Sequence, residues 1–255
     1  MLEKIKDENI IFIDIETVGQ HPTFADLNNT EQRLWERKMQ WHIEKDNTTA
    51  AEIYNRAAIW AEFGKIVCIS IGYIFTKDNC KTLRIKSFYG HSEREILLGF
   101  KTMIETRFNK SQYLLCAHNG KEFDFPYISR RMLVNGIRLP KILDYAGHKP
   151  WEVRHLDTLD LWRFGDYKHY TSLELLSSIF GIDSPKEEMD GSQVHEFYWQ
   201  NDNLTAIAEY CQRDVITICQ LMMRYKGQPL IDSNNIEITE PFLGEEPIDD
   251  NTEKA

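Results

Sequence analysis

The feature that most constrains the fold is a short apolar run near the start of the chain. Residues 9–16 are β-branched and apolar almost without interruption until two acids, Asp14 and Glu16, arrive at its end. A strand with apolar side chains on both sides of its pleat is buried on both faces. The run therefore predicts a central, covered strand whose carboxyl end carries two carboxylates.

The rest of the chain supplies partners for this strand. Residues 66–75 and 82–89 predict two strands joined by a turn at 77–79, which together form a hairpin. The elements expected after it are a helix capped by Ser92, a strand at 113–117, a helix at 125–135, a strand at 155–161, and helices at 171–180 and 204–224. Strands that alternate with helices after a hairpin indicate a mixed α/β sheet with helices on both faces.

Two segments stand outside this scheme. Because single cores stop growing only at roughly 250–300 residues, we expect one elaborated domain at 1–227, interrupted by a helical insertion at about 20–63. Residues 31–65 hold six basic and six acidic side chains, a balance that favours helices packed on the domain over a nucleic-acid patch. The acidic tail at 228–255, with three prolines, is expected to be mobile or to lie on the surface.

Charge limits the partners that the chain can take. Thirty basic against forty acidic residues give a net charge of −10, which argues against broad electrostatic binding of nucleic acid. Seven of the acids lie in residues 236–255, which contain a single lysine. A nucleic-acid partner therefore remains possible if it is held locally or through bound cations.

Compartment is inferred from what the sequence lacks. The chain has no long apolar run, and acids occupy its first eight residues, where a signal peptide needs a basic edge. Its five cysteines contain no C-x-x-C pair, so we interpret them as reduced thiols. We expect a cytoplasmic protein that has no contact with a membrane.

Three clusters of polar residues are candidates for chemistry. Asp14 and Glu16, at i and i+2 of a strand, point to the same face, where two anions repel unless a cation lies between them; exposed strand-end acids are the alternative. Asp124 follows a strand and a glycine turn at the entrance of a helix. It is either that helix's N-cap or, with Asn119 and Phe123 beside it, part of a site for a single-stranded nucleotide end.

The third cluster lies on the last helix. A spacing of four brings Tyr210 and Asp214 onto one side, next to an apolar stripe. Asp214 would thus stand at the border of the buried face, a placement that a surface acid does not need. The same spacing recurs at Tyr198 and Asp202, where the acid is better explained as the cap of the following helix.

These motifs resemble, in chain order, the three motifs of the DEDD superfamily of 3′–5′ exonucleases. The pattern is D-x-E at Asp14, N-x-x-x-x-D ending at Asp124, and Y-x-x-x-D ending at Asp214, with supporting segments at 63–72, 155–161 and 168–173. More narrowly, residues 9–224 resemble the exonucleases related to the proofreading domain of family B DNA polymerases. Position 209, where the histidine type carries its general base, is Glu209, so the chain looks like the tyrosine type.

The resemblance implies a ribonuclease H-like fold, with a five-stranded mixed sheet whose first three strands are antiparallel. It implies two divalent cations, Mg²⁺ or Mn²⁺, held by the four carboxylates, with Tyr210 orienting the attacking water and with Thr17, Asn119 and Phe123 contacting the substrate. The metal ligands expected are Asp14, Glu16, Asp124 and Asp214.

The expected function is that of a metal-dependent 3′–5′ exonuclease that removes nucleoside monophosphates from single-stranded 3′ ends by a two-metal-ion mechanism. We expect DNA, in preference to RNA, as the substrate. Two alternatives stay open, an exoribonuclease that acts on RNA ends and a non-catalytic nucleic-acid-binding module with the same fold. No protein partner is predicted.

Overall fold

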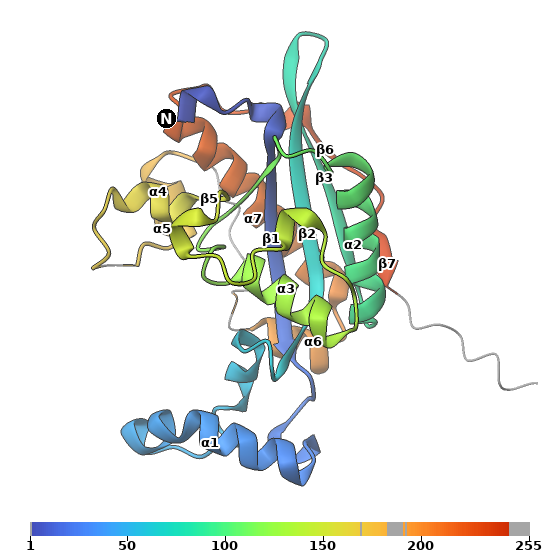
Figure 1. The fold of residues 1–255 in the computed structure, drawn as a ribbon, viewed down its shortest axis with the longest axis vertical. Coiled ribbons are helices and arrows are strands. Elements are labelled where there is room, and N and C mark those ends of the chain that lie inside the picture. The colour runs from blue at the N-terminus through green and yellow to red at the C-terminus, as the bar shows by residue number, and fades with distance from the viewer. Residues whose placement is uncertain (1, 169, 183–190, 192, 245–255) are drawn as a thin grey trace, which may run out of the picture.

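A mixed β-sheet forms the centre of the molecule (Figure 1). The computed structural model describes residues 2–168, 170–182, 191 and 193–244. The first five strands, in the order β5-β4-β1-β2-β3 across the sheet, are β1 (Ile10–Gly19), β2 (Gly64–Lys77), β3 (Cys80–Gly90), β4 (Leu114–Ala117) and β5 (Leu156–Asp157). β1 to β3 are antiparallel, and β4 and β5 run parallel to β1. The ribonuclease H-like expectation, with its first three strands antiparallel and a buried central strand, is confirmed.

The acidic tail adds two strands that were not expected. β6 (Ile236–Ile238) and β7 (Phe242–Gly244) both pair parallel with β3, so the sheet has seven strands within the described residues. The expectation of mobility is therefore wrong for these residues, because their backbone groups extend the edge of the sheet. They do lie on the surface, where Ile238 is 58% and Leu243 50% exposed. Residues 245–255, which carry much of the tail's charge, lie outside the described residues.

Helices cover both faces of the sheet. α2 (Glu93–Arg107) and α3 (Asp124–Val134) enclose one core with the odd-numbered residues of β1, such as Ile11 and Ile13. α7 (Leu204–Tyr225) covers the other face, where Ile10 and Phe12 point. α7 approaches β2 closely at Gly72, since a Cβ there would lie 2.7 Å from Val215 Cγ1.

One predicted strand is mostly a helix. Of residues 155–161, only Leu156 and Asp157 pair with β4, and α4 (Thr158–Arg163) follows at once. The Asp157 carboxylate accepts hydrogen bonds from the backbone N–H groups of Leu159 and Asp160, which is how an N-cap starts a helix.

Shorter helices fill the remaining connections. α5 (Leu173–Ile179) begins after Ser172, whose side chain caps it, and α6 (Val194–Trp199) was not predicted. The cap of α7 is Asn203, whose side chain accepts from the Ala206 N–H, so the assignment of Asp202 as that cap is wrong. The 3₁₀ helices are η1 (Leu2–Lys4), η2 (Asp7–Asn9), η3 (Phe24–Asp26), η4 (Tyr54–Ile59), η5 (Lys141–Leu143), η6 (Pro150–Glu152) and η7 (Ser233–Asn235). Within the described ranges, every helix is too short or too polar to cross a bilayer.

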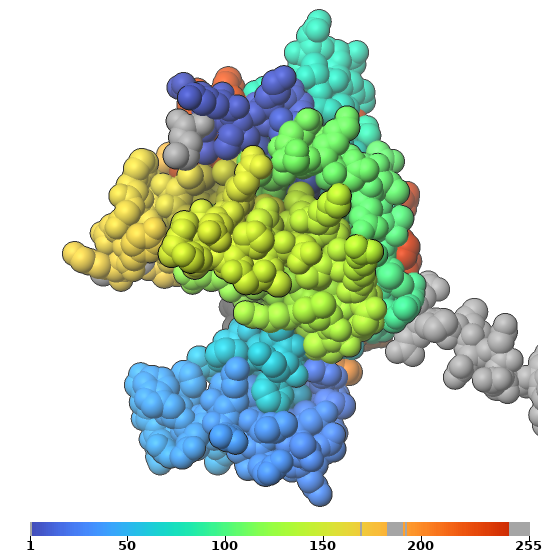
Figure 2. All heavy atoms as spheres, in the orientation of Figure 1, coloured from blue at the N-terminus to red at the C-terminus, as the bar shows by residue number. Residues whose placement is uncertain are grey.

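Residues 20–63, here called the arm, form a lobe that leaves the domain at the end of β1 (Figure 2). Its helix α1 (Asn29–Asp46) starts at Asn28, which forms a capping box with Glu31. The buried side chains of α1, Trp35 and Met39, pack in a small core made by the arm itself. The expectation of helices packed on the domain is therefore wrong for α1.

Candidate functional site: a four-carboxylate cluster

The site begins on the face of β1 that α7 covers. Ile10, Phe12 and Val18 are buried there, and Asp14 and Glu16 interrupt this apolar row. Alternation along the strand places both acids on the same face, as the sequence predicts. Glu16 is only 7% exposed, so the alternative of two exposed strand-end acids does not hold for it.

α7 carries the next group of residues to the same place. Among the charges near Asp14, that of Asp214 acts most strongly on it, which places the two carboxylates close together. Cys211, one turn from Asp214, donates its Sγ–H to the Asp14 carbonyl oxygen over 3.3 Å. Its Sγ also lies within 4.8 Å of a carboxylate oxygen of Asp14 and of Glu16.

Cys211 belongs to the apolar stripe of the last helix, and the sequence pattern does not predict this contact. Its position was nevertheless a signal, since Cys211 directly follows Tyr210 and precedes Asp214 by three positions.

The turn between β4 and α3 brings the fourth acid. At Gly120 a Cβ would lie 2.3 Å from Ala117 Cβ, so only glycine allows so tight a passage from strand to helix. Asp124, 4% exposed, is the first residue of α3, and Phe123 holds the N-cap position. The Asp124 carboxylate accepts a hydrogen bond from the backbone N–H of Ile15, between the two acids of β1. Asp124 is therefore part of the cluster.

The cluster is electrostatically strained. Burial, followed by the charges of Asp214, Glu16 and Asp124, raises the pKa of Asp14 well above its usual range. Burial also raises the pKa of Asp124 to about 8, with further contributions from Asp157 and Asp214. The Asp14 Oδ2 atom is buried and has no hydrogen-bond partner among the described residues. A buried carboxylate oxygen without a donor is costly unless a cation compensates it.

Asp157 fixes the turn before Asp124. Its carboxylate accepts from the backbone N–H groups of Asn119 and Lys121, each over 3.0 Å. Asn119 has φ of 62°, a left-handed conformation that asparagine tolerates. Asp157 thus holds one end of this turn and caps α4, which is a structural role.

The remaining predicted residues lie around the cluster. Thr17 faces the opposite side of β1, and its hydroxyl donates to the Ala58 carbonyl of η4 over 2.9 Å, which ties the arm to the strand. Phe123 is half-buried beside Tyr127, with ring centroids 5.2 Å apart. Tyr210 is half-buried, and the Arg213 guanidinium lies 5.9 Å from its ring centroid. Contact between a nucleotide and Thr17, Asn119 or Phe123 stays a prediction.

Another aromatic residue, Tyr170, lies near the acids and was not predicted as a site residue. Partial burial, and then the charges of Asp157, Asp124 and Asp214, raise the pKa of its hydroxyl.

Comparison with known proteins identifies the family of the chain. Residues 59–232 match the family described as "Predicted 3′-5′ exonuclease related to the exonuclease domain of PolB", and the chain belongs to this family. The match includes Asp124, Tyr210 and Asp214 but begins after Asp14 and Glu16.

Archaeal polymerases are more distant relatives. A DNA polymerase of Pyrococcus horikoshii is 26% identical over 213 residues, which cover 71% of this chain and 17% of that protein. DNA polymerase 1 of Pyrococcus abyssi is 26% identical over the same length, with 27% of its chain covered. The chain thus spans about a sixth to a quarter of these polymerases.

Proposed function

We propose that this protein is a metal-dependent 3′–5′ exonuclease that hydrolyses the terminal phosphodiester bond of single strands, with DNA preferred. One observation carries the proposal, the buried and unpartnered Asp14 Oδ2 amid three further carboxylates. The family to which the chain belongs is described as a predicted 3′–5′ exonuclease. The polymerases to which it is similar are named for DNA, which supports the substrate preference.

The donor atoms suit hard divalent cations. Carboxylate oxygens are the ligands that Mg²⁺ and Mn²⁺ prefer, and the orphaned Asp14 oxygen is the atom that a cation would satisfy. We expect Asp14, Glu16 and Asp214 to hold one ion, and Asp14 with Asp124 to hold the second. Bound divalent ions supply acidification of a water molecule and neutralisation of the charge that develops on the phosphate.

The protein's own residues position the reactants. Asp124 is held against β1 by the Ile15 N–H, so its carboxylate is oriented before substrate arrives. The Tyr210 hydroxyl would orient the attacking water, and Asn119 and Phe123 would hold the terminal nucleotide. The water gives up a proton as its oxygen bonds to phosphorus, the bond to the upstream 3′ oxygen breaks, and that oxygen takes a proton. The products are a nucleoside monophosphate and a strand one nucleotide shorter.

The test uses 5′-labelled single strands of DNA and of RNA with Mn²⁺ or Mg²⁺. We expect stepwise shortening of DNA from the 3′ end, loss of activity in excess chelator, and intact circular single strands because these have no end. Cleavage of RNA but not of DNA would make RNA the substrate. Binding without cleavage would favour a non-catalytic module.

A further inference from the structure

Outside the carboxylate cluster, the exposed side of α1 carries a row of basic and aromatic side chains. Positions i, i+4, i+8 and i+12 along this helix form one ridge, and here that ridge carries three cations and a tryptophan, all exposed. The members of this ridge, here called the cationic ridge, are Arg33, Arg37, Trp41 and Lys45. It extends over about 18 Å at 1.5 Å per residue.

The ridge separates charges that balance in the sequence. Residues 31–65 contain as many acids as bases, yet Glu36 and Glu44 lie on a neighbouring ridge, where Gln40 donates to Glu44 over 2.9 Å. In the described part of the chain, the three cations of the cationic ridge form no ion pair. Lys38, by contrast, pairs with Glu62 at 3.8 Å and lies over the Trp60 ring.

Trp41 differs from the other tryptophan of its helix. Trp35 is 0% exposed in the arm's core, whereas Trp41 is 61% exposed, with Lys45 Nζ 4.6 Å from its ring centroid. An exposed aromatic ring between cations is the combination by which single-stranded nucleic acids are bound without regard to sequence, since bases stack on the ring and phosphates meet the cations.

The arm is fastened to the strand that carries the carboxylates. Besides the bond from Thr17 to Ala58, the Tyr127 hydroxyl donates to the same Ala58 carbonyl over 2.8 Å. At the base of the arm, the Gly19 N–H donates to His195 Nδ1, and Trp199 Nε1 donates to the Gly19 carbonyl. A nucleic-acid strand bound on the arm would therefore be held on a lobe that is hydrogen-bonded to the domain near the carboxylate cluster.

We propose that the cationic ridge binds the single-stranded nucleic acid upstream of the 3′ end. The inference rests on the proposed function, which supplies the acidic site at that end. A chain with a net charge of −10 and a carboxylate cluster at its site repels a polyanion. When no divalent cation is bound at the site, a local group of cations outside it would have to hold the nucleic-acid strand.

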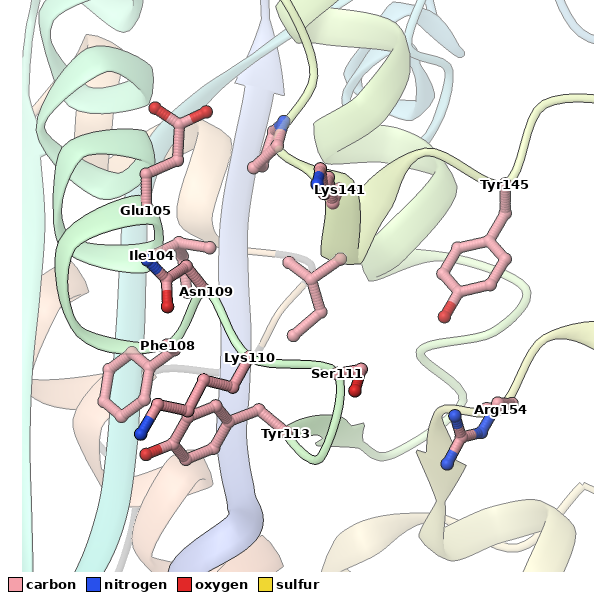
Figure 3. A pocket seen from close by; sticks show the side chains of 12 residues that line it. Ile104, Glu105, Phe108, Asn109, Lys110, Ser111, Tyr113, Lys141, Tyr145 and Arg154 are labelled. Carbon is pink, nitrogen blue, oxygen red and sulfur yellow. The ribbon is translucent and has the colours of Figure 1, made fainter.

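A second group of cations provides the matched control. Lys110, Lys141 and Arg154 line a cavity of about 620 Å³ together with Tyr113 and Tyr145 (Figure 3). This cavity lies where β4 begins, at the end of the sheet opposite to the carboxylates. Replacing these three cations removes the same charge as replacing the three cations of the ridge.

The experiment measures binding of a labelled 30-nucleotide single strand by fluorescence anisotropy in chelator, where no cleavage occurs. We expect Arg33→Gln/Arg37→Gln/Lys45→Gln to weaken binding at least tenfold and to reduce the slope of log K against log salt by about 2, since each phosphate contact on single strands contributes about 0.7. Trp41→Ala should weaken binding about tenfold, and Trp41→Phe should restore most of it. The control Lys110→Gln/Lys141→Gln/Arg154→Gln should change affinity less than twofold.

Equal losses in the two triple variants, no loss in the ridge variant, or no binding by the wild-type protein would overturn the inference. Cleavage by the wild-type protein is assayed separately with Mn²⁺. If binding depends on the ridge but no cleavage occurs, the exonuclease proposal is refuted and the ridge proposal stands. If cleavage occurs but binding does not depend on the ridge, the ridge proposal is refuted and the exonuclease proposal stands.

Discussion

Asp7 and Asp14 are acids of the same short stretch of chain, and the fold treats them in opposite ways. Burial alone would raise the pKa of Asp7, but hydrogen bonds from Lys226 and Lys81 outweigh it and hold that pKa below its usual value. Asp14 has acids around it instead, and its pKa is raised. Asp7, a structural carboxylate, is thus paired with two lysines of the same chain.

The difference shows how to distinguish a stabilising acid from a functional one. Lys226 is buried beside Asp7 and donates to it, so the charges cancel within the chain. At Asp14 compensation has to come from outside, because the charges that act on it most strongly are the like charges of Asp214, Glu16 and Asp124. A cluster like this destabilises the protein alone and is expected to be stabilised by a divalent cation.

The largest effect concerns activity at the two aspartates. Asp14→Asn should lower kcat/KM for single-stranded DNA by at least about a thousandfold, ~4 kcal/mol in transition-state free energy, because it removes a ligand shared by both ions. Asp7→Asn and the exposed turn variant Asp78→Asn should leave the folded enzyme's rate within twofold of wild type. An active Asp14→Asn enzyme would contradict the ligand assignment.

The next effect concerns stability at Asp7. Asp7→Asn should lower the free energy of unfolding by about 3–5 kcal/mol, since it leaves the buried Lys226 ammonium without its counter-charge. Urea denaturation of the metal-free protein measures this. Replacing the lysine as well, in Asp7→Asn/Lys226→Met, should recover part of the loss, and no recovery would mean that the ion pair is not the cause.

A third buried group, His155, is kept neutral rather than paired. Burial lowers its pKa from 6.5 to about 4, and Nδ1 accepts from the Leu115 N–H while Nε2 bonds to the Ile142 carbonyl. A histidine with a lowered folded pKa contributes stability that is complete above pH 6.5 and is lost as pH falls towards 4. Relative to His155→Gln, we expect wild type to lose about 3 kcal/mol over this window. The comparison is needed because the raised pKa values of Asp14 and Asp124 add stability as pH falls, in both proteins.

The measurement is urea denaturation at pH 7, 5.5 and 4.5. His155→Gln, which keeps a donor and an acceptor, should lack this loss. Asp7 contributes to a separate window, because its lowered pKa costs stability only as pH falls below its ordinary value of 3.8. The same slope in His155→Gln and in wild type would refute the assignment.

The smallest effect concerns a neutral group at the cluster. Tyr210→Phe should slow cleavage about tenfold, ~1.4 kcal/mol, because it removes one hydrogen bond that orients water. Asp214→Asn should slow it far more. Tyr198→Phe, in the other Y-x-x-x-D pattern, is the control and should not change the rate. If Tyr210→Phe and Asp214→Asn lowered the cleavage rate equally, the Tyr210 phenol would do more than orient water.

Much of the sheet could be predicted because its strands have strong local signals. The apolar run before Asp14 and the hairpin at 66–89 correspond to β1, β2 and β3. The segment 155–161 misled because Leu156, Asp157 and Leu159 are equally compatible with a strand and with a capped helix. Only the pairing of Leu156 and Asp157 with β4 decides between them.

The acidic residues of the site could be predicted from the sequence, whereas the contacts around them could not. Strand and helix periodicity place Asp14 beside Glu16 and Tyr210 beside Asp214, since these are local relations. That the Ile15 N–H bonds to Asp124, or that Cys211 donates to Asp14, depends on how separate elements pack. The strands of the tail were missed because they are three residues long and gain their stability from the edge of β3.

Metal-dependent stability shows whether the four carboxylates hold divalent cations. Thermal unfolding is recorded in chelator and with Mn²⁺ at about a hundredfold excess over its Kd, for wild type, Asp14→Asn and Asp78→Asn. Binding of this strength contributes about 2.7 kcal/mol, so the midpoints of wild type and Asp78→Asn should rise by about 5–10 °C. Asp14→Asn should start above wild type in chelator and gain nothing from the metal. A wild-type protein that does not respond to Mn²⁺, or an Asp14→Asn protein that responds equally, would contradict the account.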